Sequence, residues 1–322
     1  MIYKKMSKLS IVVPVYYNSD TLEMLYEDLK QKVLNKLDEY EIVFVDDGSG
    51  DNSWEIMNKI REKDCNVVCT KLSRNFGEHA ALLAGLSVCT GDCAVTKQAD
   101  LQEDSSLILD MYESWKRGNK VVLAIRASRD ESAVKKFFAG IYYWMVRKVV
   151  NKDMPQGGCD CYLIDRQVIE VLEKMDEKNS SLTLQVMWLG FKSEKIYFDR
   201  KNRAGEGKSR WTFSKKFKLV VDSLMSFTYI PVRFMSICGI LFFLAAIIGA
   251  ILVIREKLTR GTPILGYASL MCVVLMASGL ILFMLGILGE YIWRTLEESR
   301  NRPVFLIDKV EKKAKDTDEA KK

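Results

Sequence analysis

Two long stretches without a charged residue constrain the fold of this chain more than any other feature. They run from Phe234 to Ile254 and from Thr262 to Gly289. As helices, both are long enough to cross the hydrocarbon core of a bilayer, which is about 30 Å thick. Two buried helices of a soluble core are the alternative, but uncharged stretches of this length favour the membrane. The short connection, Arg255 to Gly261, predicts a helical hairpin.

The residues around the hairpin predict its orientation. Basic residues lie before the first stretch and after the second, and cytoplasmic segments carry such an excess. The connection is also basic, so this charge bias is imperfect. The long N-terminal part shows no signal peptide, because its apolar run Leu9 to Val15 contains Pro14 and leads directly into polar residues. We therefore expect a multi-pass protein of the inner (plasma) membrane, with the N-terminal part and the C-terminus in the cytoplasm.

Ahead of the hairpin, short β-branched runs alternate with segments of helical periodicity. We expect strands at Leu9–Val15, Glu41–Val45, Asn66–Leu72, Cys93–Val95 and Val121–Ile125. We expect the intervening helices at about 20–33, 53–63, 80–88 and 107–116. Such alternation predicts an α/β fold with a mostly parallel sheet and right-handed crossovers. An apolar segment ending at Ile164, two short helices and a strand at 193–198 follow.

A basic segment lies between this α/β part and the first uncharged stretch. It contains Arg200, Lys201, Arg203, Lys208, Arg210, Lys215, Lys216 and Lys218. From Phe217 to Tyr229 apolar residues recur at helical spacing, which predicts a basic amphipathic helix on the membrane surface. Nucleic acid is the competing partner for such a segment. The adjacent hairpin favours the membrane, so we expect no nucleic-acid partner.

These patterns divide the chain into four parts. We expect a cytoplasmic α/β domain at 1–212, a juxtamembrane helix at 213–231, two transmembrane helices within 232–290 (about 234–254 and 264–289) and a cytoplasmic tail at 291–322. Small and polar residues in the second membrane helix, such as Ser278 and Gly279, would allow a homo-oligomer.

Composition excludes several classes of protein. The chain is 48% hydrophobic and 28% charged, which is too apolar for a disordered chain. Its eight cysteines contain no CxxC pair, and His79 is its one histidine. A zinc site is therefore not expected, and the cysteines are interpreted as reduced thiols.

Polar motifs follow the first four predicted strands. In order they are Ser10-Ile-Val-Val-Pro-Val-Tyr16, Val45-Asp-Asp-Gly-Ser49, Arg74-Asn-Phe-Gly77 and Ala99-Asp-Leu-Gln102. Ligands of open α/β sheets bind outside the carboxyl ends of the strands. Asp100 and Gln102 would point the same way in an extended segment, and hard oxygen ligands suit a divalent cation. A polar turn with Asp104 or Ser105 as the N-cap of a helix is the plainer interpretation.

These motifs, the segment Arg203-Ala-Gly-Glu-Gly-Lys-Ser-Arg-Trp211 and the hairpin resemble the family 2 glycosyltransferases with a GT-A fold. The resemblance is to the polyisoprenyl-phosphate glycosyltransferases related to dolichyl-phosphate mannose synthase, of the bacterial bactoprenol type, and it covers nearly the whole chain. It implies inverting transfer of one sugar from a nucleotide-sugar, with a UDP-sugar expected, to polyprenyl phosphate such as undecaprenyl phosphate. The glycolipid would serve cell-surface glycan modification.

The resemblance also implies roles for residues of the donor site. Pro14 and Tyr16 would line the base, and Asp47 would accept hydrogen bonds from the base or the ribose. Asp46 would bind the donor or orient the loop. Plain turn chemistry is the alternative for the Asp-Asp-Gly-Ser segment. Arg74 and Asn75 would serve either structure or substrate contact.

For the metal and the acceptor, the resemblance implies a further set of residues. Asp100, a catalytic and donor-binding residue, would hold Mg²⁺ or Mn²⁺ on the diphosphate together with Gln102. Asp160 lies where the family's base is found, although a phosphate acceptor is already anionic, so it would serve as base or position the acceptor. The expected ligands of the acceptor phosphate are Arg126, Arg129, Arg203, Lys208, Ser209 and Arg210, for which a solvated basic face is the alternative.

Two departures from the family pattern leave questions open. Gln98-Ala-Asp100 stands where the family usually has Asp-x-Asp, so the metal would bind more weakly or Gln98 would face elsewhere. In Tyr16-Tyr-Asn-Ser-Asp20, either Asn18 replaces the family's asparagine after a one-residue insertion, or Tyr17 does so by substitution. Two other functions compete. A processive polysaccharide synthase would need a Q-x-x-R-W motif, which is absent, and a non-catalytic membrane scaffold would tolerate Gln98.

Overall fold

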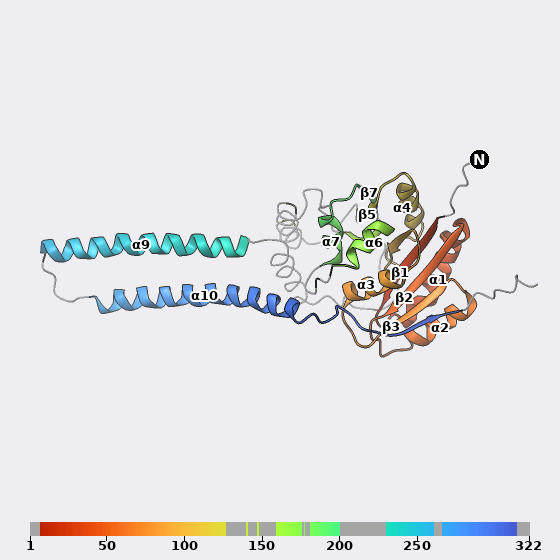
Figure 1. The fold of residues 1–322 in the computed structure, drawn as a ribbon, viewed down its shortest axis with the longest axis horizontal. Helices are drawn as coiled ribbons and strands as arrows, with labels where there is room; N and C mark the ends of the chain where they lie inside the picture. Colours follow the sequence, from red (N-terminus) through yellow and green to blue (C-terminus); the bar gives the residue numbers. More distant parts are fainter. Residues whose placement is uncertain are drawn as a thin grey trace, which may run out of the picture. The chain divides into compact units, whose positions relative to one another are not determined.

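The computed structural model describes residues 7–126, 140, 147, 159–175, 177, 181–199, 230–260 and 266–313. The chain forms two compact units, each of which is described by itself. The first comprises Met1–Leu219 together with Pro303–Lys322, and the second comprises Val220–Arg302. The first contains a sheet with helices, and the second contains two long helices (Figure 1).

The described part of the first unit forms an eight-stranded sheet in the order β7-β5-β6-β4-β1-β2-β3-β8. The strands are β1 Lys8–Val15, β2 Glu39–Asp46, β3 Val67–Leu72, β4 Cys93–Thr96, β5 Val121–Arg126, β6 Cys159–Asp165, β7 Ser193–Phe198 and β8 Ile307–Lys312. Neighbours in the run β4-β1-β2-β3 pair in parallel, as do β5 and β7. β6 is antiparallel to β4 and β5, and β8 to β3. The predicted α/β fold with a mostly parallel sheet is confirmed.

Helices cover the sheet where periodicity predicted them. They are α1 Ser19–Lys32, η1 Leu34–Lys36, α2 Ser53–Lys63, α3 Glu78–Val88, α4 Leu107–Lys116, α6 Arg166–Leu172 and α7 Leu182–Trp188. α3 is buried almost all round and packs on β1 and β2. A Cβ on Gly85 would lie 2.3 Å from Cγ1 of Val12, so glycine is needed for this close approach of helix to sheet.

Burial on both faces of the sheet explains why the strands are unbroken apolar runs in the sequence. Ile11, Val12 and Val13 are consecutive in β1, and all are fully buried. Strands of a parallel sheet that are covered on both faces lose the alternation of polar and apolar residues. The sheet therefore forms the middle layer between helices.

β8 was not predicted from the sequence. Its residues, Ile-Asp-Lys-Val-Glu-Lys, are mostly charged and exposed, so no burial pattern marks the strand. Backbone pairing with β3 and an ion pair between Arg61 and Glu311 (2.9 Å) hold it in place. The segment that follows the second long helix thus occupies an edge of the sheet in the first unit, where it satisfies the backbone groups of β3.

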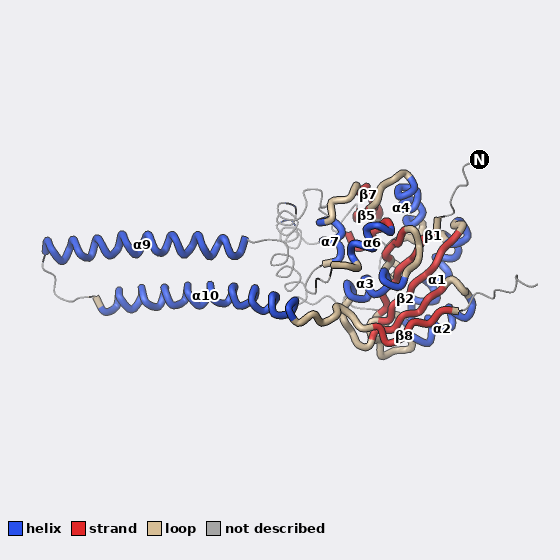
Figure 2. The backbone as a smooth tube through the Cα atoms, in the orientation of Figure 1, coloured by secondary structure: helices blue, strands red, loops and turns tan. Residues whose placement is uncertain are grey.

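The described part of the second unit contains α9 Ile230–Arg260 and α10 Tyr267–Ser299 (Figure 2). Their segments Pro231–Gly249 and Met276–Ser299 are long and apolar enough to cross a membrane. Large apolar side chains are exposed along both helices, for example Phe243 at 65% and Leu282 at 69%. Contiguous apolar surface of this kind marks a membrane or protein contact. Most of the predicted amphipathic helix at 213–231 lies outside the described residues.

Candidate active site

The predicted motifs meet at one edge of the sheet, where the parallel strands β1 to β5 end. Pro14 lies in β1 opposite Val45 of β2, and Tyr16 follows the last residue of β1. Asp46 is the last residue of β2, and Asp100 lies in the loop after β4. β6 runs the other way, so it begins at this edge. The fold therefore gathers side chains from segments that are separate in the sequence at the place where ligands of such sheets bind.

The Asp46–Asp47 turn is buried at this edge. Asp46 Oδ1 accepts a hydrogen bond from the Ser49 amide (3.0 Å), while its Oδ2 is buried without a hydrogen-bond partner in the described structure. The two oxygens of Asp47 accept the amides of Phe76 (2.7 Å) and Gly77 (2.9 Å). Burial raises the pKa of both carboxyl groups. Asp47 thus anchors the Arg74–Gly77 loop, while Asp46 keeps an oxygen that a ligand could use.

Gly48 lets this turn and the Arg74–Gly77 loop lie against each other. Its φ is +70°, and a Cβ would approach the Asn75 nitrogen to 2.6 Å and the Arg74 carbonyl carbon to 2.7 Å. An L side chain would therefore be strained and would also collide with backbone. Two motifs that are separate in the sequence form one structural unit, and Arg74 and Asn75 are exposed on it.

The loop after β1 closes the same edge. The Tyr16 amide donates to Oδ1 of Asn18 (3.0 Å), and the Tyr17 amide donates to the Ser49 hydroxyl (3.0 Å). Tyr17 has a φ of 52°, and its side chain is 45% exposed. The two tyrosine rings meet edge to face with centroids 4.7 Å apart. The side-chain amide of Asn18 therefore makes the hydrogen bond within this turn, whereas Tyr17 bonds to Ser49 through its backbone amide.

The loop after β4 is held by a buried ion pair. Lys97 Nζ donates to the Glu103 carbonyl oxygen (2.6 Å) and lies 3.5 Å from the Glu103 carboxylate. Between them Leu101 has a φ of 57°, and the Gln102 amide donates to Asp100 Oδ1 (3.2 Å). The pair closes the loop, so Asp100 and Gln102 are presented on a fixed turn rather than on an extended segment.

The N-cap of α4 is Ser106, which makes no side-chain capping hydrogen bond, so the prediction of Asp104 or Ser105 as N-cap is wrong. Asp104 Oδ1 accepts hydrogen bonds from the amide (3.0 Å) and the hydroxyl (2.9 Å) of Ser106, directly ahead of α4. Asp104 thus belongs to a local turn ahead of α4, whereas Asp100 lies in the preceding loop.

Side chains that carry oxygen atoms gather at the carboxyl end of β4. Asp100 and Gln102 lie in the loop, and Gln98 Nε2 donates to Oε1 of Glu78 (2.6 Å) from the start of α3. Among the described residues, no three or more His, Cys, Asp or Glu side chains form a group that could hold a metal. Mg²⁺ is usually held by one or two carboxylates together with substrate phosphates. The donor set therefore fits a divalent cation that a bound diphosphate would share.

The expected acceptor residues are only partly within the described structure. Arg126 ends β5, and its neighbour Ile125 pairs with Cys159, so the backbone of Asp160 lies at the same edge. The Asp160 side chain and the residues Arg129, Arg203, Lys208, Ser209 and Arg210 lie outside the described residues. Their roles stay predictions.

Sequence reasoning did not select Glu78, Lys97 or Tyr162. The hydroxyl of Tyr162 and Nδ1 of His79 are buried without hydrogen-bond partners in the described structure. Each of these features depends on contacts between segments that are far apart in the chain. No local pattern in the sequence marks them.

Comparison with known proteins gives the class. Residues 10–172 match the family described as Glycosyl transferase family 2. The chain is 35% identical over 301 residues to the uncharacterized glycosyltransferase YkcC of Bacillus subtilis, and the match covers 93% of each chain. The protein therefore belongs to glycosyl transferase family 2 and is a glycosyltransferase.

The relatives with more specific names are similar over their whole length. The chain is 31% identical to the prophage bactoprenol glucosyl transferase homolog of Escherichia coli K12, over 95% of this chain and 100% of that one. It is 32% identical to the bactoprenol glucosyl transferase of Shigella phage SfII, over 94% and 98%. Among solved structures, S. aureus TarS 1-349 with UDP-GlcNAc matches with a TM-score of 0.44 at 18% identity, over 62% of this chain and 60% of that one. This weaker likeness says nothing about donor or metal.

Proposed function

We propose that this protein transfers a single sugar from a nucleotide-sugar, with a UDP-sugar expected, to polyprenyl phosphate such as undecaprenyl phosphate. The observation that carries the proposal is the buried Asp46–Asp47 turn beside the Asp100 loop, in a chain that also contains two candidate membrane spans. Relatives named bactoprenol glucosyl transferase, which match over nearly their whole length, support a lipid acceptor. The reaction would take place at the cytoplasmic membrane face.

In this proposal the donor lies across the carboxyl edge of the sheet. Pro14 and Tyr16 line the base, and the unpartnered oxygen of Asp46 accepts a hydrogen bond from the base or ribose. Asp47, the predicted contact, reaches the donor alongside the amides that it already holds. Asp100 and Gln102 hold Mg²⁺ or Mn²⁺, and such a cation stabilises negative charge on the departing diphosphate.

The sugar is transferred by direct displacement. An oxygen of the acceptor phosphate attacks the anomeric carbon, the bond to the diphosphate breaks, and the configuration inverts. Asp160 positions the acceptor, because a phosphate that is already anionic needs little deprotonation. The phosphate is bound by Arg126, Arg129, Arg203, Lys208, Ser209 and Arg210, since arginine forks match phosphate oxygens. Most of the catalysis comes from positioning and charge stabilisation.

Transfer of radiolabelled sugar into an organic-extractable lipid tests the proposal. Full-length protein is incubated with undecaprenyl phosphate, a panel of UDP- and GDP-sugars, and Mn²⁺, Mg²⁺ or EDTA. We expect one labelled lipid that carries one sugar and disappears with EDTA. Label that survives EDTA would remove the metal from the proposal. Label that reaches soluble glycan or protein but never lipid phosphate would contradict the acceptor.

A non-catalytic membrane scaffold is the second candidate, and Gln98 is the observation that favours it. The neutral amide brings no charge to the place where the family usually has a carboxylate. In that case UDP-sugar binding would be measurable by calorimetry, while no donor in the panel would give labelled lipid. A lipid that carries many sugars would instead indicate a processive synthase.

A further inference from the structure

Gln98 is oriented by a charged partner. Its Nε2 donates to Oε1 of Glu78 at 2.6 Å, and hydrogen bonds to charged groups are shorter than those between neutral groups. An ionised carboxylate can only accept hydrogen bonds, so the amide nitrogen must be the atom that faces Glu78. The amide oxygen, which is the atom able to bind a cation, is thereby turned away from Glu78.

The Asp46–Asp47 turn fixes the backbone directly before Glu78. Glu78 is the first residue of α3 and follows Gly77, whose amide is bound by Asp47 Oδ2 (2.9 Å). Burial is the main cause that raises the pKa of Asp47, and the charges of Asp46 and Glu78 add to it. Burial is also the main cause that raises the pKa of the unpartnered Tyr162 hydroxyl, and the charges of Cys159 and Glu78 add to it. Glu78 thus lies between the Asp46–Asp47 turn and the loop after β4.

A simpler role for Glu78 would be to stabilise the start of α3, because a carboxylate in the first turn interacts favourably with the helix dipole. That role needs no particular neighbour. Glu55 in the first turn of α2 is an example, and it is exposed. The hydrogen bond from Gln98 sets Glu78 apart and connects the start of α3 to the β4 loop that carries Asp100.

We propose that Glu78 and Gln98 act as a pair in place of the first aspartate of the family's Asp-x-Asp pattern. In this pair, Gln98 offers its amide oxygen to the cation on the donor diphosphate, and Glu78 orients that amide and supplies the negative charge. Partners that orient a metal ligand from behind commonly tune its affinity for the metal. Glu78 is a positioning residue in this scheme. The inference rests on the proposed function, because it requires a metal-bound donor.

Binding of Mn²⁺ in the presence of UDP tests the pair without measuring turnover. Free Mn²⁺ is measured by electron paramagnetic resonance with full-length protein in detergent. We expect Glu78→Gln to weaken Mn²⁺ binding about 10-fold, as removal of an orienting partner does at other metal sites. We expect Gln98→Asp to bind Mn²⁺ more tightly than the wild type, and Glu78→Gln to have little effect when it is added to Gln98→Asp. Glu55→Gln is the matched control and should change nothing.

Two outcomes would overturn the pair. In one, Glu78→Gln binds Mn²⁺ as tightly as the wild type. In the other, Gln98→Asp fails to remove the dependence on Glu78. If wild-type protein transfers sugar with metal but shows either outcome, the pair is wrong and the proposed function stands. If wild-type protein neither binds Mn²⁺ with UDP nor transfers sugar, both are wrong. Should Glu78→Gln fail to fold, Gln98→Asp alone still decides, because an affinity no higher than the wild type contradicts the pair.

Discussion

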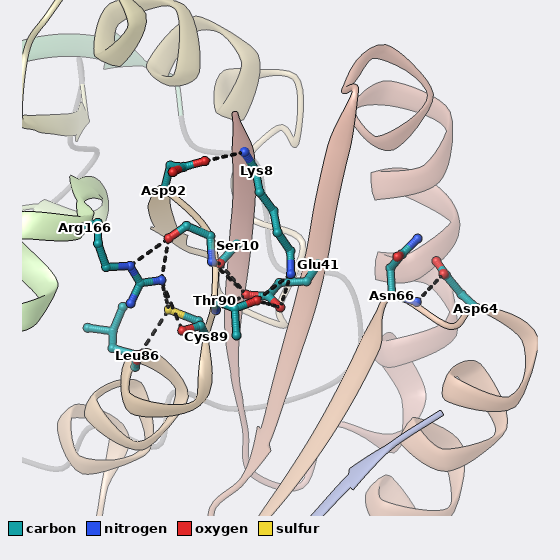
Figure 3. A network of polar contacts seen from close by, with 11 residues as sticks. Lys8, Ser10, Glu41, Asp64, Asn66, Leu86, Cys89, Thr90, Asp92 and Arg166 are labelled. Carbon is teal, nitrogen blue, oxygen red and sulfur yellow. Dashed lines mark hydrogen bonds and ion pairs between the residues drawn. The ribbon is translucent and has the colours of Figure 1, made fainter. Parts of the chain in front are cut away.

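Glu41 and Asp46 lie on the same strand, β2, at opposite ends of the sheet. The hydrogen bonding of their carboxylates differs. At the amino-terminal end, Glu41 accepts hydrogen bonds from Lys8 Nζ (2.8 Å), the Ser10 hydroxyl (2.6 Å) and both the amide and hydroxyl of Thr90 (Figure 3). At the carboxyl end, Asp46 has one bonded oxygen and one buried oxygen without a partner in the described structure.

The titration of the two carboxyl groups reflects this difference. Burial alone would raise both pKa values. Hydrogen bonds from Lys8, Ser10 and Thr90 overcome it at Glu41 and lower its pKa to about 2, whereas burial prevails at Asp46 and raises its pKa. A buried polar group with all its bonds made stabilises the fold, and one with a bond unmade has a cost that a ligand can remove.

Arg166 adds further hydrogen bonds to the network around Glu41 at the amino-terminal end of the sheet. Its guanidinium donates to the carbonyl oxygens of Gly91 (2.8 Å from Nε) and Cys89 (3.1 Å) (Figure 3). Buried charge alone therefore does not identify a site. The state of its hydrogen bonds separates the structural end of this sheet from the end that we propose to be functional.

Replacing Asp100 should have the largest effect. Asp100→Asn should lower sugar transfer at least about 100-fold, because it removes the charge closest to the proposed diphosphate site. The melting temperature should change little, since the side chain is only half-buried and the asparagine oxygen can still accept the Gln102 amide. Asp110→Asn, on the exposed face of α4, is the control. Equal activity of the two variants would show that Asp100, at the carboxyl end of the sheet, takes no part in catalysis.

Breaking the amino-terminal network should affect stability and leave donor affinity unchanged. Glu41→Gln should lower the free energy of unfolding by about 3 kcal/mol at neutral pH, measured by urea denaturation. The pKa of Glu41 is lowered from 4.5 to about 2 in the folded protein, so its contribution is present above pH 4.5 and is lost as the pH falls toward 2. The difference between wild type and variant should therefore shrink over that range. A constant difference would contradict this role.

Gly48→Ala should disturb the carboxyl end through the backbone. Its positive φ and its close approach to Arg74 and Asn75 together should cost about 2 kcal/mol and weaken UDP binding. Gly118→Ala is a matched control, because Gly118 has a φ of +94° but nothing within 4 Å of a Cβ. The control should be destabilised and still bind UDP normally. If both variants bind UDP alike, the contact between the two motifs does not shape the donor site.

Removing β8 should have the smallest effect of these four changes. The Leu306 carbonyl accepts the Ser73 amide (3.0 Å), just ahead of the Arg74–Gly77 loop that Asp47 anchors. Deleting residues 306–322 removes this bond, so UDP affinity should fall about fivefold, the equivalent of about 1 kcal/mol. Deleting only 314–322 is the control. Unchanged affinity in the longer deletion would show that the loop does not depend on the returning strand.

How much the sequence predicted depends on where each element obtains its stability. β1 to β5 were predicted because buried parallel strands are β-branched and apolar, and α1 to α4 because their burial has helical periodicity. β8 was missed because it is charged, exposed and held by pairing with a strand far away in the chain. The motifs mark the edge of the sheet at which we propose the active site. The Glu78–Gln98 hydrogen bond and the Lys97–Glu103 pair are tertiary contacts that no local pattern marks.

The most direct test of the account is hydrogen–deuterium exchange of the full-length protein, with and without UDP and Mn²⁺. We expect bound ligand to protect the carboxyl-end segments 16–18, 45–49, 74–78 and 97–102. We expect no change in the amino-end segments 8–10 and 89–92, whose hydrogen bonds are already made. Protection centred on the amino-end segments, or none at the carboxyl end under conditions where UDP binds, would contradict the account.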